Sequence, residues 1–239
     1  MAVYVLSVQE WHFDGWLQRY LWRPFKWIGQ LFGAVGRRGV VLAGLLLLAA
    51  GGAGWLLSDT AAFPVYRQLP LVFSGAGLLL VLQAFTERAD ARRAWWMALL
   101  SQFLMVLAIA WNKDLPGQQI LLYLAGSTAA GIVGYGCLQR LRATEGDLSL
   151  DQYHGHSYEQ PGLTLVFLVA CLAMAGFPIT PTFIGIDLLF THISAEQLAL
   201  VLLTALNFLF IELTLLRIYA RIFLGQHKKA YHPIAFKWS

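Results

Sequence analysis

Long apolar stretches separated by short polar segments dominate the chain, and six of them are candidates to cross a bilayer. A transmembrane helix needs about 20 mostly apolar residues. The six candidate spans begin at or near Gly39, Leu69, Ala94, Gln119, Gly162 and Gln197. The pattern therefore predicts an all-α polytopic membrane protein, a bundle of about six transmembrane helices.

The fifth apolar stretch, residues 162–193, is too long for one straight span. Its roughly 32 residues would form a helix of about 48 Å, whereas the hydrocarbon core of a bilayer is about 30 Å thick. Proline removes a backbone N–H and its ring clashes with the preceding turn, and glycine loosens the chain. The stretch contains four such residues, Gly176, Pro178, Pro181 and Gly185. We therefore expect a discontinuous helix, two half-helices joined by an unwound segment.

The composition agrees with a membrane protein. Of 239 residues, 58% are hydrophobic and only 13% are charged, which soluble domains do not show. The formal net charge of +4 is explained by basic loops at a membrane surface, so it does not indicate nucleic acid. Cys137 and Cys171 lie inside apolar stretches, where buried free thiols are expected in place of a disulfide or a zinc site.

The basic residues predict an orientation. Of the 17 Lys and Arg residues, only Arg67 and Lys113 fall on the second side of the membrane when six spans alternate. By the positive-inside rule, both termini are expected in the cytoplasm. No cleavable signal peptide is apparent at the N-terminus, so the first span is expected to act as its own insertion signal.

The N-terminal segment, residues 1–38, is predicted to lie at the membrane surface. Tryptophan prefers the headgroup region, and basic residues favour an anionic surface. Its four membrane-interface anchors are Trp11, Trp16, Trp22 and Trp27. The segment reads as an interfacial amphipathic helix or as a docking segment for a partner, and the two readings are compatible. Residues 39–225 form the predicted transmembrane bundle, followed by a cytoplasmic tail at 226–239.

Two carboxylates lie well inside predicted spans, Asp187 just beyond the break and Glu212 near the middle of the sixth span. Intramembrane ionisable residues are costly and are functional candidates by default. A carboxylate removed from water holds a proton more readily, and unwound backbone beside it can hold water. Both acids are therefore candidate members of a proton relay. The alternative is a structural role, with Glu212 hydrogen-bonded to a neighbouring helix.

Two more residues complete the candidate ion pathway. His192 lies at the outer end of the broken helix, where an imidazole that titrates near neutral pH would gate proton exchange; the alternative is an ordinary interfacial histidine. Arg217 follows Glu212 by five residues, toward the cytoplasm. Its alternative role is to extend its side chain to the interface. The polar residues Ser101 and Gln102 of the third span are expected to join helices.

No metal, cofactor or enzymatic chemistry is expected. Asp151, His154 and His156 lie in the polar loop before the fifth span, but mixed ligands in a loop without cysteine form a weak metal pattern. The sequence shows no phosphate-binding loop, no dinucleotide-binding glycine motif and no H-E-x-x-H motif. Transport or scaffolding within a membrane fits this chain better than catalysis.

The stretch ACLAMAGFPITPTFIGIDLLF, from Ala170, resembles the broken helix of the antiporter-like subunits of respiratory complex I and of Mrp-type cation/proton antiporters. The pattern of that family reads roughly L-S-L-x-G-x-P-P-x-x-G-F-x-x-K. The flanking stretches LLYLAGSTAAGIVGYGCLQRL and LALVLLTALNFLFIELTLLRIYARIFLG resemble the preceding and following helices. The resemblance covers about residues 95–224. Energy-coupled inorganic carbon pumps of the DAB type are related to the same family.

The departures from the family pattern bear on function. The family fold has two inverted five-helix repeats, and this chain has room for about one. The lysine of the broken helix falls at Ile186, and Asp187 matches the acid that follows it in some members. The glutamate and lysine of the first repeat have no counterpart.

The resemblance thus implies an accessory or half-size subunit of a proton- or cation-translocating complex in the bacterial inner membrane, beside a full-length antiporter-like subunit. A carbonic anhydrase-like cytoplasmic subunit would be a further partner in a carbon pump. The alternatives are a structural scaffold that docks a partner and has no ion path, and an independent small carrier.

Overall fold

The computed structural model describes residues 37–57, 68–112, 117–191, 193 and 197–225. The chain divides into two compact units, Met1–Leu46 and Leu47–Ser239. The predicted interfacial helix with its four tryptophans, His192 and the tail at 226–239 lie outside the described residues.

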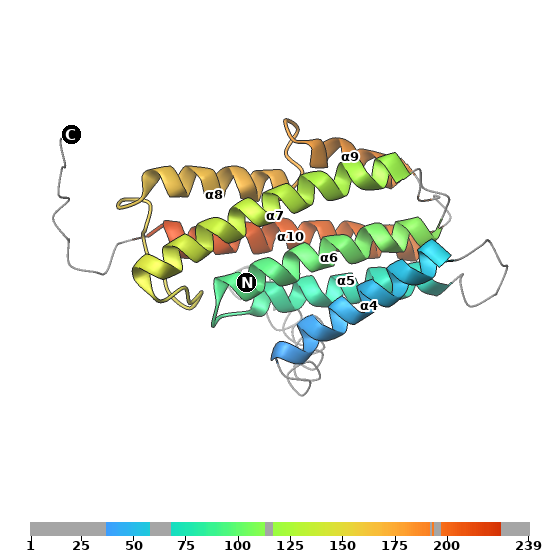
Figure 1. The fold of residues 1–239 in the computed structure, drawn as a ribbon, viewed down its shortest axis with the longest axis horizontal. Coiled ribbons are helices and arrows are strands. Elements are labelled where there is room, and N and C mark those ends of the chain that lie inside the picture. The colour runs from blue at the N-terminus through green and yellow to red at the C-terminus, as the bar shows by residue number, and fades with distance from the viewer. Residues whose placement is uncertain (1–36, 58–67, 113–116, 192, 194–196, 226–239) are drawn as a thin grey trace, which may run out of the picture. The chain divides into compact units, whose positions relative to one another are not determined.

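Every regular element of the described ranges is an α-helix (Figure 1). The helices are α4 (Arg37–Leu57), α5 (Leu69–Thr86), α6 (Ala91–Asn112), α7 (Gly117–Glu145), α8 (Pro161–Met174), α9 (Pro181–Thr191) and α10 (Leu198–Phe223). By length and composition, α5, α6, α7 and α10 can each cross a membrane, and the remaining apolar helices are shorter. The prediction of an all-α membrane helix bundle is confirmed.

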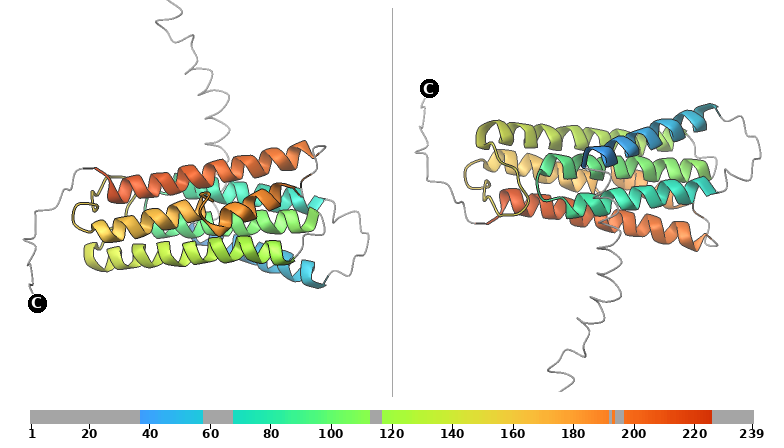
Figure 2. Two further views of the ribbon diagram at one scale, coloured as in Figure 1. Left: turned by 90° about the horizontal axis from the view of Figure 1, so that it is seen from above. Right: turned by 90° about the horizontal axis from the view of Figure 1, so that it is seen from below.

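The central helix of the unit Leu47–Ser239 is α6. Its residues are buried along almost the whole length, and it contacts α5, α7 and α10. In Figures 1 and 2, α8 and α9 follow one another along α7. Small residues allow this packing: a Cβ at Gly134 of α7 would overlap the ring of Trp95, whose indole N–H donates to the carbonyl of Gly131 over 2.9 Å.

The second half of α4 is joined to α6 by two indole hydrogen bonds. Trp55 donates to the carbonyl of Ala110 over 3.2 Å, and Trp111 donates to the carbonyl of Gly51 over 3.1 Å. Backbone carbonyls inside a helix can accept a second hydrogen bond because each carries two lone pairs. The pair therefore fixes the register of the two helices within this unit.

The fifth predicted span is broken as expected. Helix α8 ends at Met174 and α9 begins at Pro181. Gly176 has φ of +75°, and the N–H groups of Gly176 and Phe177 return to the carbonyls of Ala173 and Leu172. This is the glycine-terminated helix end that requires a left-handed residue. Pro178 lies in the unwound segment, outside both helices.

Gly185 has a different role from the one expected. It lies inside α9 and not in the unwound segment, and a Cβ there would come within 2.7 Å of the Cβ of Tyr123. The missing side chain lets α9 pack closely against α7. The break is therefore made by the residues from Gly176 to Pro181, while Gly185 serves helix packing.

The polar loop between α7 and α8 closes one end of the bundle. The backbone N–H groups of His154, His156 and Ser157 donate to the carbonyls of Arg221, Ile222 and Phe223. These are carbonyls of the last turn of α10, which have no partner within the helix. The two cysteines are free and buried, as expected.

Candidate functional site at the broken helix

The unwound segment faces a buried glutamine of α6. The Gln102 side chain is fully buried, and its Nε2 donates to the carbonyl of Met174 over 2.7 Å. Cys171, Leu172 and Ala173 all give their carbonyls to N–H groups of residues 175–177. Met174 is the last residue of α8, and its carbonyl has no backbone N–H partner among the residues described at the break. The side-chain amide of Gln102 supplies the missing donor.

Further buried polar atoms lie on α9 and α7, next to the break in the chain. Neither Oε1 of Gln102 nor Oγ1 of Thr182, in the first turn of α9, has a hydrogen-bond partner among the described residues. Thr182 lies against α7, because a Cβ at Gly126 would be 2.5 Å from its hydroxyl oxygen. Ser127, next to Gly126, adds another buried hydroxyl. Buried polar atoms without protein partners are normally satisfied by water.

A second polar cluster joins α5, α6 and α10 at Ser101, the residue before Gln102. Ser101 Oγ lies 2.9 Å from the carbonyl oxygen of Gly77 and 3.0 Å from Oδ1 of Asn207. A hydroxyl donates one hydrogen at a time, so Ser101 can donate to only one of these two acceptors. The Nδ2 of Asn207 has no partner within the described ranges. The clusters of Ser101 and Gln102 thus form one polar layer inside an apolar bundle.

Asp187 and Glu212 both lie on the outer surface of the unit, away from this polar layer. Both are exposed, and neither carboxylate makes a hydrogen bond or ion pair with a described residue. Glu212 interrupts a row of exposed leucines along α10. These are Leu198, Leu202, Leu206, Leu209, Leu213 and Leu216. A carboxylate in such a row finds no hydrogen-bond donor or cation in the described part of the chain.

The two acids lie at similar depth. The rings of Phe190 and Phe208 meet at 5.6 Å between centroids, and α9 and α10 run in opposite directions (Figure 1). Asp187 precedes Phe190 by three residues and Glu212 follows Phe208 by four, so each lies about 5 Å along its axis from this contact. In antiparallel helices both displacements point the same way, which places both carboxylates on the side of the break.

Arg217 is held by the end of α5. Its guanidinium donates to the carbonyls of Phe85 and Glu87, over 3.0 Å to the latter, and lies over the ring of Phe85. A cation at the C-terminus of a helix donates hydrogen bonds to the last carbonyls and interacts favourably with the negative end of the helix dipole. The described contacts of Arg217 are therefore with two backbone carbonyls and one aromatic ring, and no described carboxylate pairs with it.

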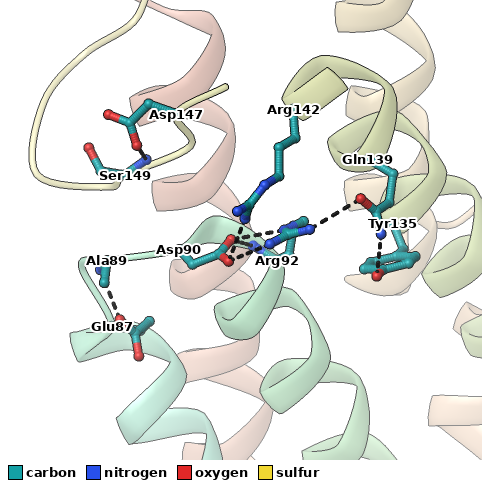
Figure 3. Close-up of polar contacts among 9 residues, drawn as sticks. All are labelled: Glu87, Ala89, Asp90, Arg92, Tyr135, Gln139, Arg142, Asp147 and Ser149. Carbon is teal, nitrogen blue, oxygen red and sulfur yellow. Dashed lines mark hydrogen bonds and ion pairs between the residues drawn. The ribbon is translucent and has the colours of Figure 1, made fainter. Parts of the chain in front are cut away.

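A network that the sequence analysis missed links the start of α6 to the end of α7 (Figure 3). Asp90 accepts from the backbone N–H of Arg92 over 2.9 Å and pairs with the guanidinium groups of Arg92 at 2.8 Å and Arg142 at 3.2 Å. An aspartate a few residues before a long apolar run is a candidate helix N-cap, and Asp90 directly precedes Ala91, the first residue of α6. That local signal predicts the cap, but the pairing with Arg142, 52 residues away, needs the fold.

Curated relatives of the chain come from several bacteria. Subunit N 1 of the NADH-quinone oxidoreductase of Streptomyces griseus is 33% identical over 162 residues, 65% of this chain and 34% of the relative. Subunit N of Mycobacterium sp. is 32% identical over 54% of this chain and 27% of the relative. Subunit N of Geotalea uraniireducens is 26% identical over 62% of this chain and 30% of the relative.

The chain spans about a third of the length of these relatives. No family model matches the chain, and no solved structure matches it significantly. The relatives confirm the resemblance that the broken-helix sequence predicts. Over 54–65% of its length, this chain is similar to subunit N of NADH-quinone oxidoreductase, an antiporter-like subunit of complex I.

Proposed function

We propose that the chain is an accessory subunit of a proton- or cation-translocating complex of the bacterial inner membrane, and that its ion path is completed by a partner membrane subunit. The relatives are subunits of NADH-quinone oxidoreductase, which favours a complex I-like assembly. In this proposal the chain carries no catalytic site, and both termini lie in the cytoplasm.

The observation that carries the proposal is the outward position of Asp187 and Glu212. An aspartate at the centre of a bilayer costs about 2.5–3.5 kcal/mol on insertion scales. Neither acid has a polar partner in the described part of the chain, and both belong to apolar helices. A partner helix that offers a basic or hydrogen-bonding side chain at this depth would remove the cost, and it would give the two acids a proton donor and acceptor.

The broken helix supplies the second part of the path. Gln102 and Thr182 bring polar atoms to the two ends of the break, at Met174 and in the first turn of α9, and Ser127 adds a buried hydroxyl on α7. Water held by these atoms and by the unwound backbone would connect the interior of the bundle with the side on which Asp187 lies. Irregular backbone at membrane depth is tolerated where it lines such a cavity.

A structural scaffold remains the second candidate function, and specific contacts favour it. Arg217 ties α10 to α5, and Ser101 ties α6 to both. In this reading the polar layer only fixes the helices, and the exposed acids bind a partner without moving protons.

The partner can be identified by extracting the tagged chain from its native membrane in mild detergent and analysing what migrates with it. The proposal predicts a full-length antiporter-like subunit in the same complex. A carbonic anhydrase-like protein in that complex would direct the proposal to inorganic carbon uptake. Migration of the chain alone, or as a homodimer, would contradict the accessory role.

A further inference from the structure

Three ligating side chains meet where α7 joins the following loop. They are Glu145, His156 and Glu159, and one nitrogen or oxygen atom of each lies within 4.8 Å of the others. Glu145 is the last residue of α7, whereas His156 and Glu159 lie in the loop before α8. His156 is only 2% exposed, so its ring is part of the folded interior and not of a solvated surface.

The backbone at these positions is held in place. The N–H of His156 donates to the carbonyl of Ile222 over 3.3 Å, and its own carbonyl accepts from the N–H of Gln160 over 3.0 Å. The side chain of Gln160 reaches Thr144, the neighbour of Glu145, over 3.4 Å. The backbone of His156 is therefore held by the end of α10 and by Gln160, and the side chains of Glu145 and Glu159 meet its imidazole there.

The donor set suits a divalent transition metal. One imidazole nitrogen and two carboxylate oxygens are ligands of Zn²⁺ in open sites, while Mg²⁺ and Ca²⁺ prefer oxygen-only environments. Two atoms bound to one Zn²⁺ at about 2.1 Å each are at most about 4.2 Å apart. The ligand atoms of the three residues are up to 4.8 Å apart, and small side-chain rotations would bring them within about 4.2 Å. The two carboxylates balance the charge of the ion.

The other two candidate ligands of the loop, Asp151 and His154, are not members of this set, although the ring of His154 stacks on that of His156 at 5.4 Å between centroids. His154 directs Nε2 to the carbonyl of Ser149 over 2.8 Å, and Asp151 lies 3.9 Å from the guanidinium of Arg88. The loop sequence suggests Asp151, His154 and His156 as metal ligands. Of these three residues, only His156 belongs to the ligand set that the fold brings together.

We propose that Glu145, His156 and Glu159 form a binding site for a divalent transition-metal ion such as Zn²⁺. Three protein ligands leave at least one coordination position for water. The bound ion would fasten the end of α7 to the loop that caps α10. The proposal does not depend on the transport function. The competing arrangement is a protonated imidazole between two carboxylates, which needs no metal.

The test uses the full chain, purified with a tag that contains no histidine, stripped with a chelator and titrated with Zn²⁺ by calorimetry. We expect one saturable equivalent, with no comparable binding of Mg²⁺ or Ca²⁺. His156→Gln and the double variant Glu145→Gln/Glu159→Gln should each weaken binding at least about tenfold, because each removes ligands. Asp151→Asn and Asp147→Asn are matched controls from the same loop and should bind Zn²⁺ as the wild type does.

Three results would overturn the proposal: no saturable Zn²⁺ binding by the wild type, unchanged binding by the double glutamine variant, or an equal loss in Asp151→Asn. Because His156 is buried, its variant is first checked for folding by its helical circular dichroism. If it is unfolded, the double variant decides, since it leaves the imidazole in place. The absorption spectrum of bound Co²⁺ gives an independent readout, expected in the wild type and absent from the double variant.

Discussion

Gln102 of α6 donates its side-chain amide to the carbonyl of Met174, the last residue of α8, over 2.7 Å. The other three carbonyls in the last turn of α8 accept from residues 175–177. A single side chain from the most buried helix therefore completes the hydrogen bonding of the break. The contact fixes where α8 stops, and it places a polar group of the core beside the unwound segment.

Replacing Gln102 with leucine should destabilise the bundle. The change keeps a similar volume but leaves the buried carbonyl of Met174 without a donor, at a cost of about 1–3 kcal/mol. Thermal unfolding of the purified chain in detergent measures the effect. Gln152→Leu, at an exposed loop position, is the control and should leave the melting temperature nearly unchanged. Equal melting temperatures for Gln102→Leu and the wild type would show that the contact is not needed for stability.

Two glycines of α7 allow a matched packing test. An added Cβ at Gly134 would overlap the buried ring of Trp95, whereas at Gly136 it would meet nothing within 4 Å. Gly134→Ala should lower the free energy of unfolding by about 1–3 kcal/mol through overpacking. Gly136→Ala should be neutral or slightly stabilising, because alanine favours the helix. Similar melting curves for the two variants would contradict the packing of α6 against α7.

A reciprocal amide pair joins the end of α6 to the start of α10. Asn112 donates to Gln197 over 2.9 Å, and Gln197 donates back over 2.7 Å. A double-mutant cycle with Asn112→Leu and Gln197→Leu should give a coupling energy of about 0.6 kcal/mol, the average for polar pairs between membrane helices. The cycle is measured by unfolding in detergent. Additive effects of the two changes would show that the pair contributes no joint stability.

The role of Arg217 as a helix cap predicts a specific response to lysine. Arg217→Lys keeps the charge but loses the planar group that reaches two carbonyls. We expect faster hydrogen exchange of the amides near the end of α5, around Phe85 and Glu87, with little change in α7. Arg140→Lys, at an exposed position, is the control. Exchange at α5 that does not change in Arg217→Lys would argue against the cap.

The sequence was sufficient to predict the helices and the break. Length and hydropathy predict six spans, because a bilayer requires about 20 apolar residues in each, and four of the described helices have that length and composition. The broken helix is a local property, since Gly176 and Pro181 act on the backbone of their own turn. The pattern of glycine and proline thus predicts where α8 ends and α9 begins to within a few residues.

The faces of the helices could not be predicted in the same way. The lipid is as apolar as the bundle interior, so core-facing and lipid-facing positions have similar side chains. Helix α6 is buried almost throughout and α10 exposes a row of leucines, although both read as continuous apolar runs. The outward position of Glu212 and the contact of Gln102 with Met174 depend on long-range packing and follow only from the structure.

The most direct measurement of the central claim is proton flux through the purified complex in liposomes, followed with a pH-sensitive dye. The double variant Asp187→Asn/Glu212→Gln removes both outward carboxylates with minimal change in shape. Asp147→Asn, in an exposed loop, is the control. We predict at least about a tenfold loss of flux in the double variant, with the complex still assembled, and normal flux in the control. Full flux in an assembled double variant would contradict the ion path and leave the chain a structural scaffold.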